Sequence, residues 1–176
     1  MTAIPAPEYS HAIPMSEIGG KPVDYQLQAD AGQRAALARR FDLLSLDRLV
    51  AAVELHRDGE DYQVKGRLEA EVVQACVVTD APVSAHIVED FTVRFIAERD
   101  FSPDSEIELS ESDGDTQFHD GRMIDLGEAV AQTLGLAINP FPRSPEAGAA
   151  LKAAGVLGEG EAGPFAALAA LRKIPD

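Results

Sequence analysis

Cysteine is nearly absent from this sequence, which contains only Cys76 among its 176 residues. A single cysteine excludes a disulfide within the chain and a cysteine-rich zinc site built by one copy. Long apolar runs are also missing, so no stretch reaches the ~18 apolar residues that a membrane-spanning helix needs. Residues 1–8 lack the basic and apolar regions of a secretory signal peptide. We therefore expect a cytoplasmic protein with no membrane partner.

Basic residues are scarce. The chain has 15 lysines and arginines against 30 aspartates and glutamates, which gives a formal net charge of −15. This balance argues against sequence-independent docking on a nucleic-acid backbone and against an anionic membrane surface, because both need a basic face. A basic partner is electrostatically easier, although solubility alone explains the acidity equally well.

Catalytic motifs are missing too. The sequence contains no nucleophile elbow, no phosphate-binding loop and no dinucleotide-binding glycine pattern. Its four histidines are scattered and form no metal-ligand pattern. We therefore expect a protein that is not an enzyme, with no catalytic residue, no metal site, no cofactor and no small-molecule substrate. An enzyme that uses Asp125, Glu128 or His119 near one helix start is the lesser alternative.

The acidic residues concentrate between residues 98 and 120, where nine acids accompany one basic residue, Arg99. Ser-Pro and Asp-Gly pairs lie in the same stretch and favour turns over regular structure. We expect a solvated acidic loop around one short strand.

Alternating apolar and polar residues predict strands at 23–27, 49–55, 62–72 and 87–95, with the Asp58-Gly59 turn between the second and the third. Gly66 interrupts one apolar row and predicts a bulge or a close approach, and Glu89 interrupts the apolar row of the last strand. Asp30 and Gln33 form a capping-box pattern at the start of a helix. The fold class expected is α+β, a mainly antiparallel β-sheet packed with a few short helices.

A second helix is predicted to start after Asp125, which suits an N-cap, with Glu128 as a carboxylate at the third helical position. Apolar residues then recur at four-residue spacing and form a core-facing stripe. Pro140 and Pro142 end this helix and stiffen its exit. Arg143 follows this proline-stiffened segment, and its position is equally compatible with a binding residue and with a surface charge.

These pieces resemble the YceD family, also called the large ribosomal RNA subunit accumulation proteins. The matching blocks are GRLEA at 66–70, VQACVVTDAPV at 73–83, IDLGE at 124–128, NPFPR at 139–143 and PFAAL at 164–168. The resemblance implies a small bacterial cytosolic factor in ribosome biogenesis that supports accumulation of large-subunit (23S) ribosomal RNA, and it implies no reaction.

Many members of this family carry Cys-x-x-Cys where this chain has Cys76-Val77-Val78-Thr79, and a second cysteine pair downstream. Four such thiolates would suit tetrahedral zinc. Thr79 stands here in place of the second cysteine, and the chain has no other cysteine. We therefore expect no zinc site, and we expect Cys76 to behave as a buried small apolar residue.

The resulting domain prediction is an N-terminal tail or edge segment at 1–20, a YceD-like α+β domain at 21–143 with the acidic loop 98–120, a flexible linker at 144–163 and a C-terminal helix at 164–173. Two binding modes stay open. One is contact with ribosomal RNA or a large-subunit precursor through the candidate binding residues Arg34, Arg39, Arg40, Asn139 and Arg143. The other is an acidic scaffold or chaperone that binds a basic ribosomal protein without contacting RNA.

Overall fold

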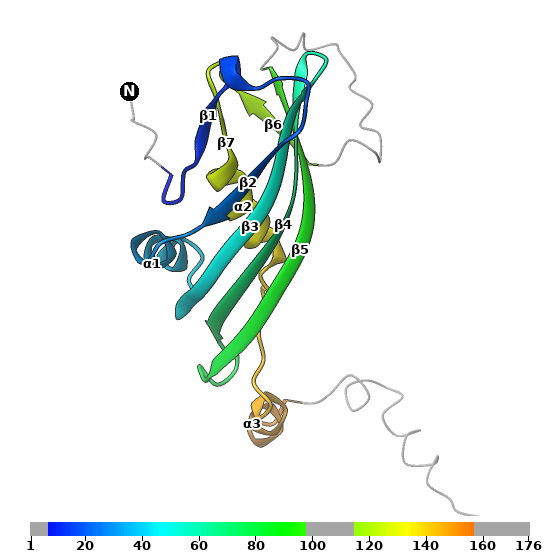
Figure 1. Ribbon diagram of the computed structural model, residues 1–176. Coiled ribbons are helices and arrows are strands. Elements are labelled where there is room, and N and C mark those ends of the chain that lie inside the picture. Colours follow the sequence, from blue (N-terminus) through cyan, green and yellow to red (C-terminus); the bar gives the residue numbers. More distant parts are fainter. Residues whose placement is uncertain (1–6, 98–114, 157–176) are drawn as a thin grey trace, which may run out of the picture. The chain divides into compact units, whose positions relative to one another are not determined.

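The computed structural model describes residues 7–97 and 115–156 (Figure 1). The chain divides into two compact units. The first combines Met1–Gln74 with Ser84–Asn139, and the second combines Ala75–Val83 with Pro140–Asp176.

The first unit is built on a five-stranded sheet in the order β2-β3-β4-β5-β6. Its strands are β2 (Val23–Gln28), β3 (Ser45–Asp58), β4 (Asp61–Ala75), β5 (Pro82–Ala97) and β6 (Asp115–His119). The pairings of β2 with β3 and of β3 with β4 are antiparallel, whereas β6 runs parallel to β5. The expected α+β fold with a mainly antiparallel sheet is therefore confirmed.

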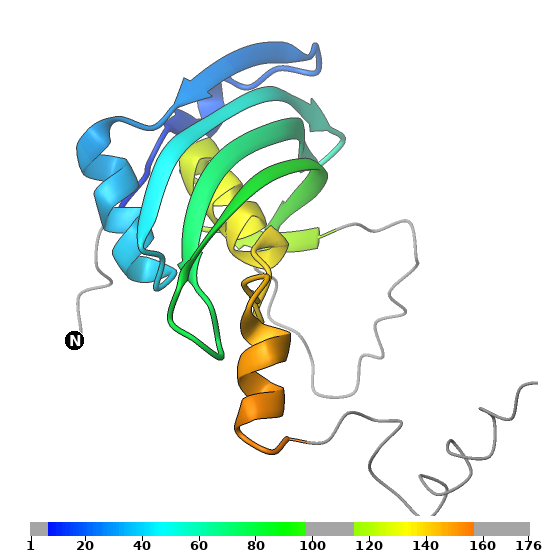
Figure 2. The ribbon, with the colours of Figure 1, turned by 90° about the horizontal axis from the view of Figure 1, so that it is seen from below.

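The sheet curves around the helix α2 (Leu126–Ala137), which lies inside its concavity (Figure 2). Leu126, Val130 and Leu134 of this helix are completely buried. They face the buried alternate residues of the long strands, among them Leu49 and Leu68. The apolar stripe and the strand alternation in the sequence thus meet in one core.

Four shorter elements complete the described part of the first unit. The helix α1 (Ala31–Arg40) follows β2, and it begins with the capping box of Asp30 and Gln33 that the sequence predicts. The strand β1 (Ala12–Pro14) leads into the 3-10 helix η1 (Met15–Glu17). β1 pairs antiparallel with β7 (Met123–Asp125), the strand that immediately precedes α2. This pairing places the N-terminal segment beside the start of α2.

Gly66 lies at a close approach and not at a bulge. Its pairing with Val53 is in regular register, and the register shift of β3 against β4 falls between Leu46 and Arg48. A Cβ atom on Gly66 would lie 2.7 Å from the Cζ atom of Phe91 and 2.8 Å from the carbonyl oxygen of Ala52. Glycine is required here because no side chain fits beneath the Phe91 ring.

The second unit contains the turn between β4 and β5 and the helix α3 (Ala147–Ala153). This helix falls within residues 144–163, for which the sequence predicts a flexible linker. A short helix built mainly of alanine and glycine has too few large apolar side chains to show a helical period, which is why the sequence pattern did not predict it. The expected helix at 164–173 and the 98–114 part of the acidic loop lie outside the described residues. None of the helices in the described residues has the length and hydropathy of a membrane-spanning segment.

Candidate functional site

The three candidate arginines of α1 differ in the hydrogen bonds and ion pairs that their side chains form. Arg40 donates two hydrogen bonds to the Glu128 carboxylate, from Nη1 at 2.9 Å and from Nη2 at 2.8 Å, and pairs with Glu8 at 3.1 Å. Arg34 donates to the carbonyl oxygen of Ala29 at 2.7 Å. Arg39 is exposed and has no ionic partner among the residues that the structure describes. The helix therefore offers one uncommitted arginine to a ligand and not three.

Glu128 lies in the first turn of α2, as predicted, and it also forms contacts that the sequence did not predict. Its carboxylate accepts from Arg40 and, at 3.0 Å, from Gln132 Nε2. Its pKa is lowered chiefly by the hydrogen bonds from Arg40. Only the fold brings Arg40 within reach of this carboxylate.

Asp125 is the N-cap of α2, as predicted, and it also binds the N-terminal segment. Its Oδ1 atom accepts from the backbone N–H of Glu128 at 3.1 Å and from that of His11 at 2.8 Å. Its Oδ2 atom accepts from Ser10 Oγ at 2.5 Å. Both oxygens are therefore engaged within the fold, which leaves this carboxylate unsuited to acid–base chemistry on a substrate.

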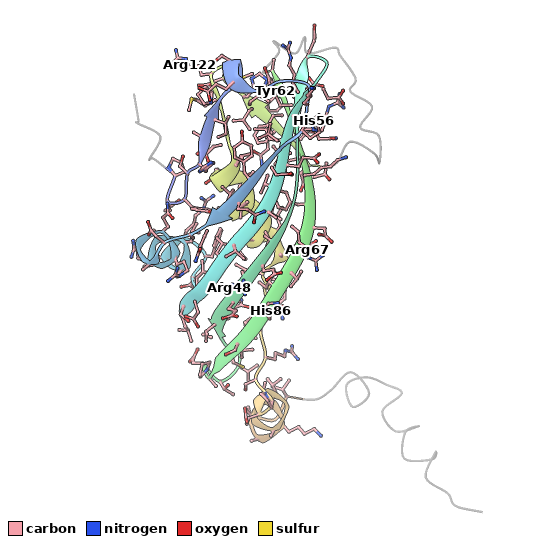
Figure 3. The ribbon with its side chains drawn as sticks, viewed as in Figure 1. Arg48, His56, Tyr62, Arg67, His86 and Arg122 are labelled. Atoms are coloured by element: carbon pink, nitrogen blue, oxygen red, sulfur yellow. The ribbon has the colours of Figure 1, made fainter. Side chains whose placement is uncertain are left out.

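The outward face of the sheet carries arginines that are paired with carboxylates. Arg67 bonds to Asp90 at 2.9 and 3.1 Å, and Arg94 bonds to Asp61 at 2.6 Å. Arg48 lies 3.7 Å from Glu69 on the neighbouring strand. Figure 3 shows Arg48 and Arg67 at separate places along the strands. The described part of this face thus has mixed charge and no basic patch.

Asn139 and Arg143 belong to different units. In the first unit, the carbonyl oxygen of Asn139 accepts from the buried Gln74 side chain at 2.8 Å. In the second unit, the carbonyl oxygen of Pro142 accepts from the N–H of Val77 at 2.9 Å, which holds the segment before Arg143 against the β4–β5 turn. Arg143 itself is exposed, and it has no ionic partner within the described ranges.

Cys76 is buried, as predicted, but it is not a simple apolar residue. Its Sγ atom accepts from the backbone N–H of Ser144 at 3.2 Å and from that of Val78 at 3.5 Å. The Ser144 N–H first, and the Thr79 side chain second, lower the pKa of the thiol to about 6. Hydrogen bonds of this kind favour the thiolate. The sequence could not show this because Ser144 lies 68 positions away.

The family's zinc chemistry does not fit these residues. Beside Cys76 stand the hydroxyls of Thr79 and Ser144, whose oxygens lie 3.2 Å apart. One thiolate with two neutral hydroxyls is a poor ligand set for zinc, which in structural sites takes four cysteine or histidine ligands. No group of three His, Cys, Asp or Glu side chains in the described residues is placed to hold a metal ion.

A groove in the first unit lies between β5 and α2, and the sequence alone did not predict it. It has a volume of about 440 Å³ and is lined by Glu89, Asp90, Phe91, Thr92, Asp115, Thr133, Leu136 and Ala137. Leu136 is 77% exposed, and neither Glu89 nor Asp115 has an ionic partner among the described residues. The one sequence signal was Glu89, which breaks the apolar row of its strand. The groove combines an apolar wall with uncompensated negative charge.

Comparison with protein families identifies a family for this chain. The model of the family described as large ribosomal RNA subunit accumulation protein YceD matches residues 64–172. The matched range includes the Cys76 turn, β5, the groove and α2. No curated protein and no solved structure matches the chain.

Proposed function

We propose a function from one premise: this chain belongs to the YceD family of large ribosomal RNA subunit accumulation proteins. The proposed function is that of a non-enzymatic, cytoplasmic factor in biogenesis of the large ribosomal subunit, which supports accumulation of its RNA. The description of the family supports the link to that RNA, and it names accumulation of an RNA and not a chemical reaction.

We further propose that the chain binds a basic ribosomal protein and does not itself bind the RNA backbone. The observation that carries this choice is the pairing of three of its arginines with carboxylates of the chain. Arg40, Arg67 and Arg94 all form close ion pairs with carboxylates of the chain itself. An arginine must leave its carboxylate before it can neutralise a phosphate, so each such contact with RNA would carry an added cost.

The overall charge supports the same mode. A net charge of −15 raises the local concentration of a cationic partner and repels a polyanion. Many basic proteins aggregate or bind nucleic acid indiscriminately before assembly, and an acidic partner can shield them. Loss of that shielding would reduce the supply of the ribosomal protein to large-subunit assembly and expose the unassembled RNA to degradation.

Direct RNA contact remains as a second candidate because Arg39 and Arg143 are exposed and uncommitted in the described part of the chain. Two cations can neutralise only about two phosphates, so on their own they give a weak interaction with RNA. This mode predicts that replacing both arginines with alanine abolishes RNA association, whereas the protein-partner mode predicts no change in partner binding.

The proposed function is tested in two steps. Large-subunit RNA is first measured against small-subunit RNA in a strain that lacks this chain and in the same strain with the chain restored. A normal ratio without the chain would refute the proposed role. The tagged chain is then purified at moderate salt, with and without nuclease, and probed separately for RNA and for ribosomal proteins. Ribosomal proteins that remain after nuclease treatment support the proposed mode, and their loss with the RNA contradicts it.

A further inference from the structure

We infer that the outer edge of β5 over residues 84–92, together with the groove beneath it, binds an extended basic segment of a protein partner, which joins the sheet as an added strand. This inference rests on the proposed protein-binding function and assigns a site to it.

The first observation is an open sheet edge. β5 extends over Pro82–Ala97, but β6 pairs with it only from Val93 to Ala97. Figure 1 shows β6 beside one end of β5 alone. In the described chain, no strand pairs with the outer side of residues 84–92. Backbone N–H and C=O groups on that side are therefore available to a further strand.

The second observation is that this edge lacks the usual basic protection. Residues 84–92 read SAHIVEDFT and contain no lysine, arginine or proline. Natural edge strands are commonly protected by lysine or proline, or by a covering element. The charges here are the acids Glu89 and Asp90, of which Asp90 is paired with Arg67. These two acids disfavour pairing of the edge with an acidic strand but not with a basic one.

The third observation is the groove directly below the edge. An added strand points every second side chain toward the helix side of the sheet. There it would meet the exposed side chain of Leu136, the ring of Phe91, and the unpaired carboxylates of Glu89 and Asp115. Lysine and arginine suit this lining, because their carbon stems cover apolar surface while their charges reach the carboxylates.

The same charges argue against a second copy of this chain as the occupant. Two β5 edges paired with each other would bring Glu89 of both copies into one interface between molecules of net charge −15 each. Like charges opposed across a strand pair are destabilising. A basic partner segment is the occupant whose charge complements both the site and the chain.

The test uses the full chain and a synthetic peptide of alternating lysine and valine. Its matched control has the same sequence with every backbone nitrogen methylated, which keeps the charge but removes all the N–H groups that could pair with a strand. We expect the unmodified peptide to slow amide hydrogen exchange within residues 84–92 and to bind at least about tenfold more tightly than the methylated one. Equal affinities, or protection elsewhere in the chain, would overturn the inference.

Charge reversal in the chain provides the second arm. Glu89→Lys is expected to abolish the protection of residues 84–92 by the peptide. Asp24→Lys, on the exposed face of β2, makes the same charge change at the opposite edge of the sheet. It is expected to leave that protection intact. If Glu89→Lys still captures ribosomal proteins, the site is refuted while the proposed function stands. If wild-type protein captures none, the proposed function fails first. Protection of the edge by an RNA oligonucleotide and not by the peptide would also overturn the inference.

Discussion

Arg40 and Glu128, 88 residues apart in the sequence, join α1 to α2 through a two-pronged ion pair with donor–acceptor distances of 2.8 and 2.9 Å. Planar guanidinium and carboxylate groups in this arrangement form one of the stronger surface pairs. The pair engages Arg40, which is one of the candidate binding residues that the sequence places on α1. It therefore bears on both the stability of the fold and the choice of partner.

The first prediction concerns the pH dependence of this pair. Glu128→Gln is expected to lower the free energy of unfolding by about 1 kcal/mol at neutral pH. Because the pKa of Glu128 is lowered below its ordinary value of 4.5, its contribution is present above that value and is lost as the pH falls through the folded-state pKa. Urea unfolding of both proteins at pH 7 and in acid measures this, and the difference between them is expected to shrink in acid.

Glu8→Gln serves as the control for that prediction, because Glu8 makes a single contact with Arg40 and is more exposed. Its effect is expected to be smaller than that of Glu128→Gln. A loss of stability for Glu128→Gln that is equal at neutral and acid pH would contradict the ion-pair explanation.

The second prediction concerns Asp125, which accepts from Glu128, His11 and Ser10. Asp125→Ala removes a helix cap and two contacts to the N-terminal segment, so we expect a loss of about 2 kcal/mol. Hydrogen exchange at residues 9–14 is expected to accelerate in this variant. Asp30→Ala removes the cap of α1 without those contacts, and it is expected to destabilise the protein while the N-terminal segment keeps its protection.

The third prediction concerns Gly127, which allows the N-terminal segment to cross the first turn of α2. A Cβ atom there would lie 2.7 Å from the backbone nitrogen of His11 and 2.8 Å from the carbonyl oxygen of Tyr9. Alanine favours a helix over glycine by about 1 kcal/mol, but this contact is with backbone, so Gly127→Ala is expected to destabilise by about 1–3 kcal/mol. Thermal unfolding measures the change.

Gly148→Ala is the matched control, since Gly148 lies in α3 and has no atom within 4 Å of the added Cβ. Its substitution is expected to leave stability unchanged or to raise it slightly. If Gly127→Ala behaved in the same way, the close packing of the N-terminal segment on α2 would be wrong.

Local pattern accounts for much of the fold. Alternation placed the long strands, and the Asp30 and Asp125 caps follow from three-residue spacing. The contacts of Arg40 with Glu128, of Asp125 with Ser10 and of Cys76 with Ser144 were not predictable, because each joins segments brought together only by folding. The groove at β5 was missed for a related reason: an open edge depends on how far β6 extends beside β5, and strand alternation does not specify the partner of a strand.

The last prediction concerns the thiol of Cys76. Its pKa, lowered from an ordinary 9.0 to about 6, predicts that the folded protein carries a thiolate at neutral pH. Thiolate absorbance in the ultraviolet, followed against pH with Cys76→Ala as baseline, is expected to rise with a midpoint near 6. Thr79→Val removes the second-largest cause of the lowered pKa and is expected to move the midpoint upward, but not to the ordinary value, because the Ser144 N–H still donates.

The same thiolate makes stability depend on pH. Because its pKa is lower in the folded than in the unfolded protein, it stabilises the fold fully above about pH 9, and the contribution is lost as the pH falls through 6. Stability relative to Cys76→Ala should therefore rise between pH 6 and 9, and an absorbance midpoint near 9 in the folded protein would show that the sulfur is an ordinary buried thiol.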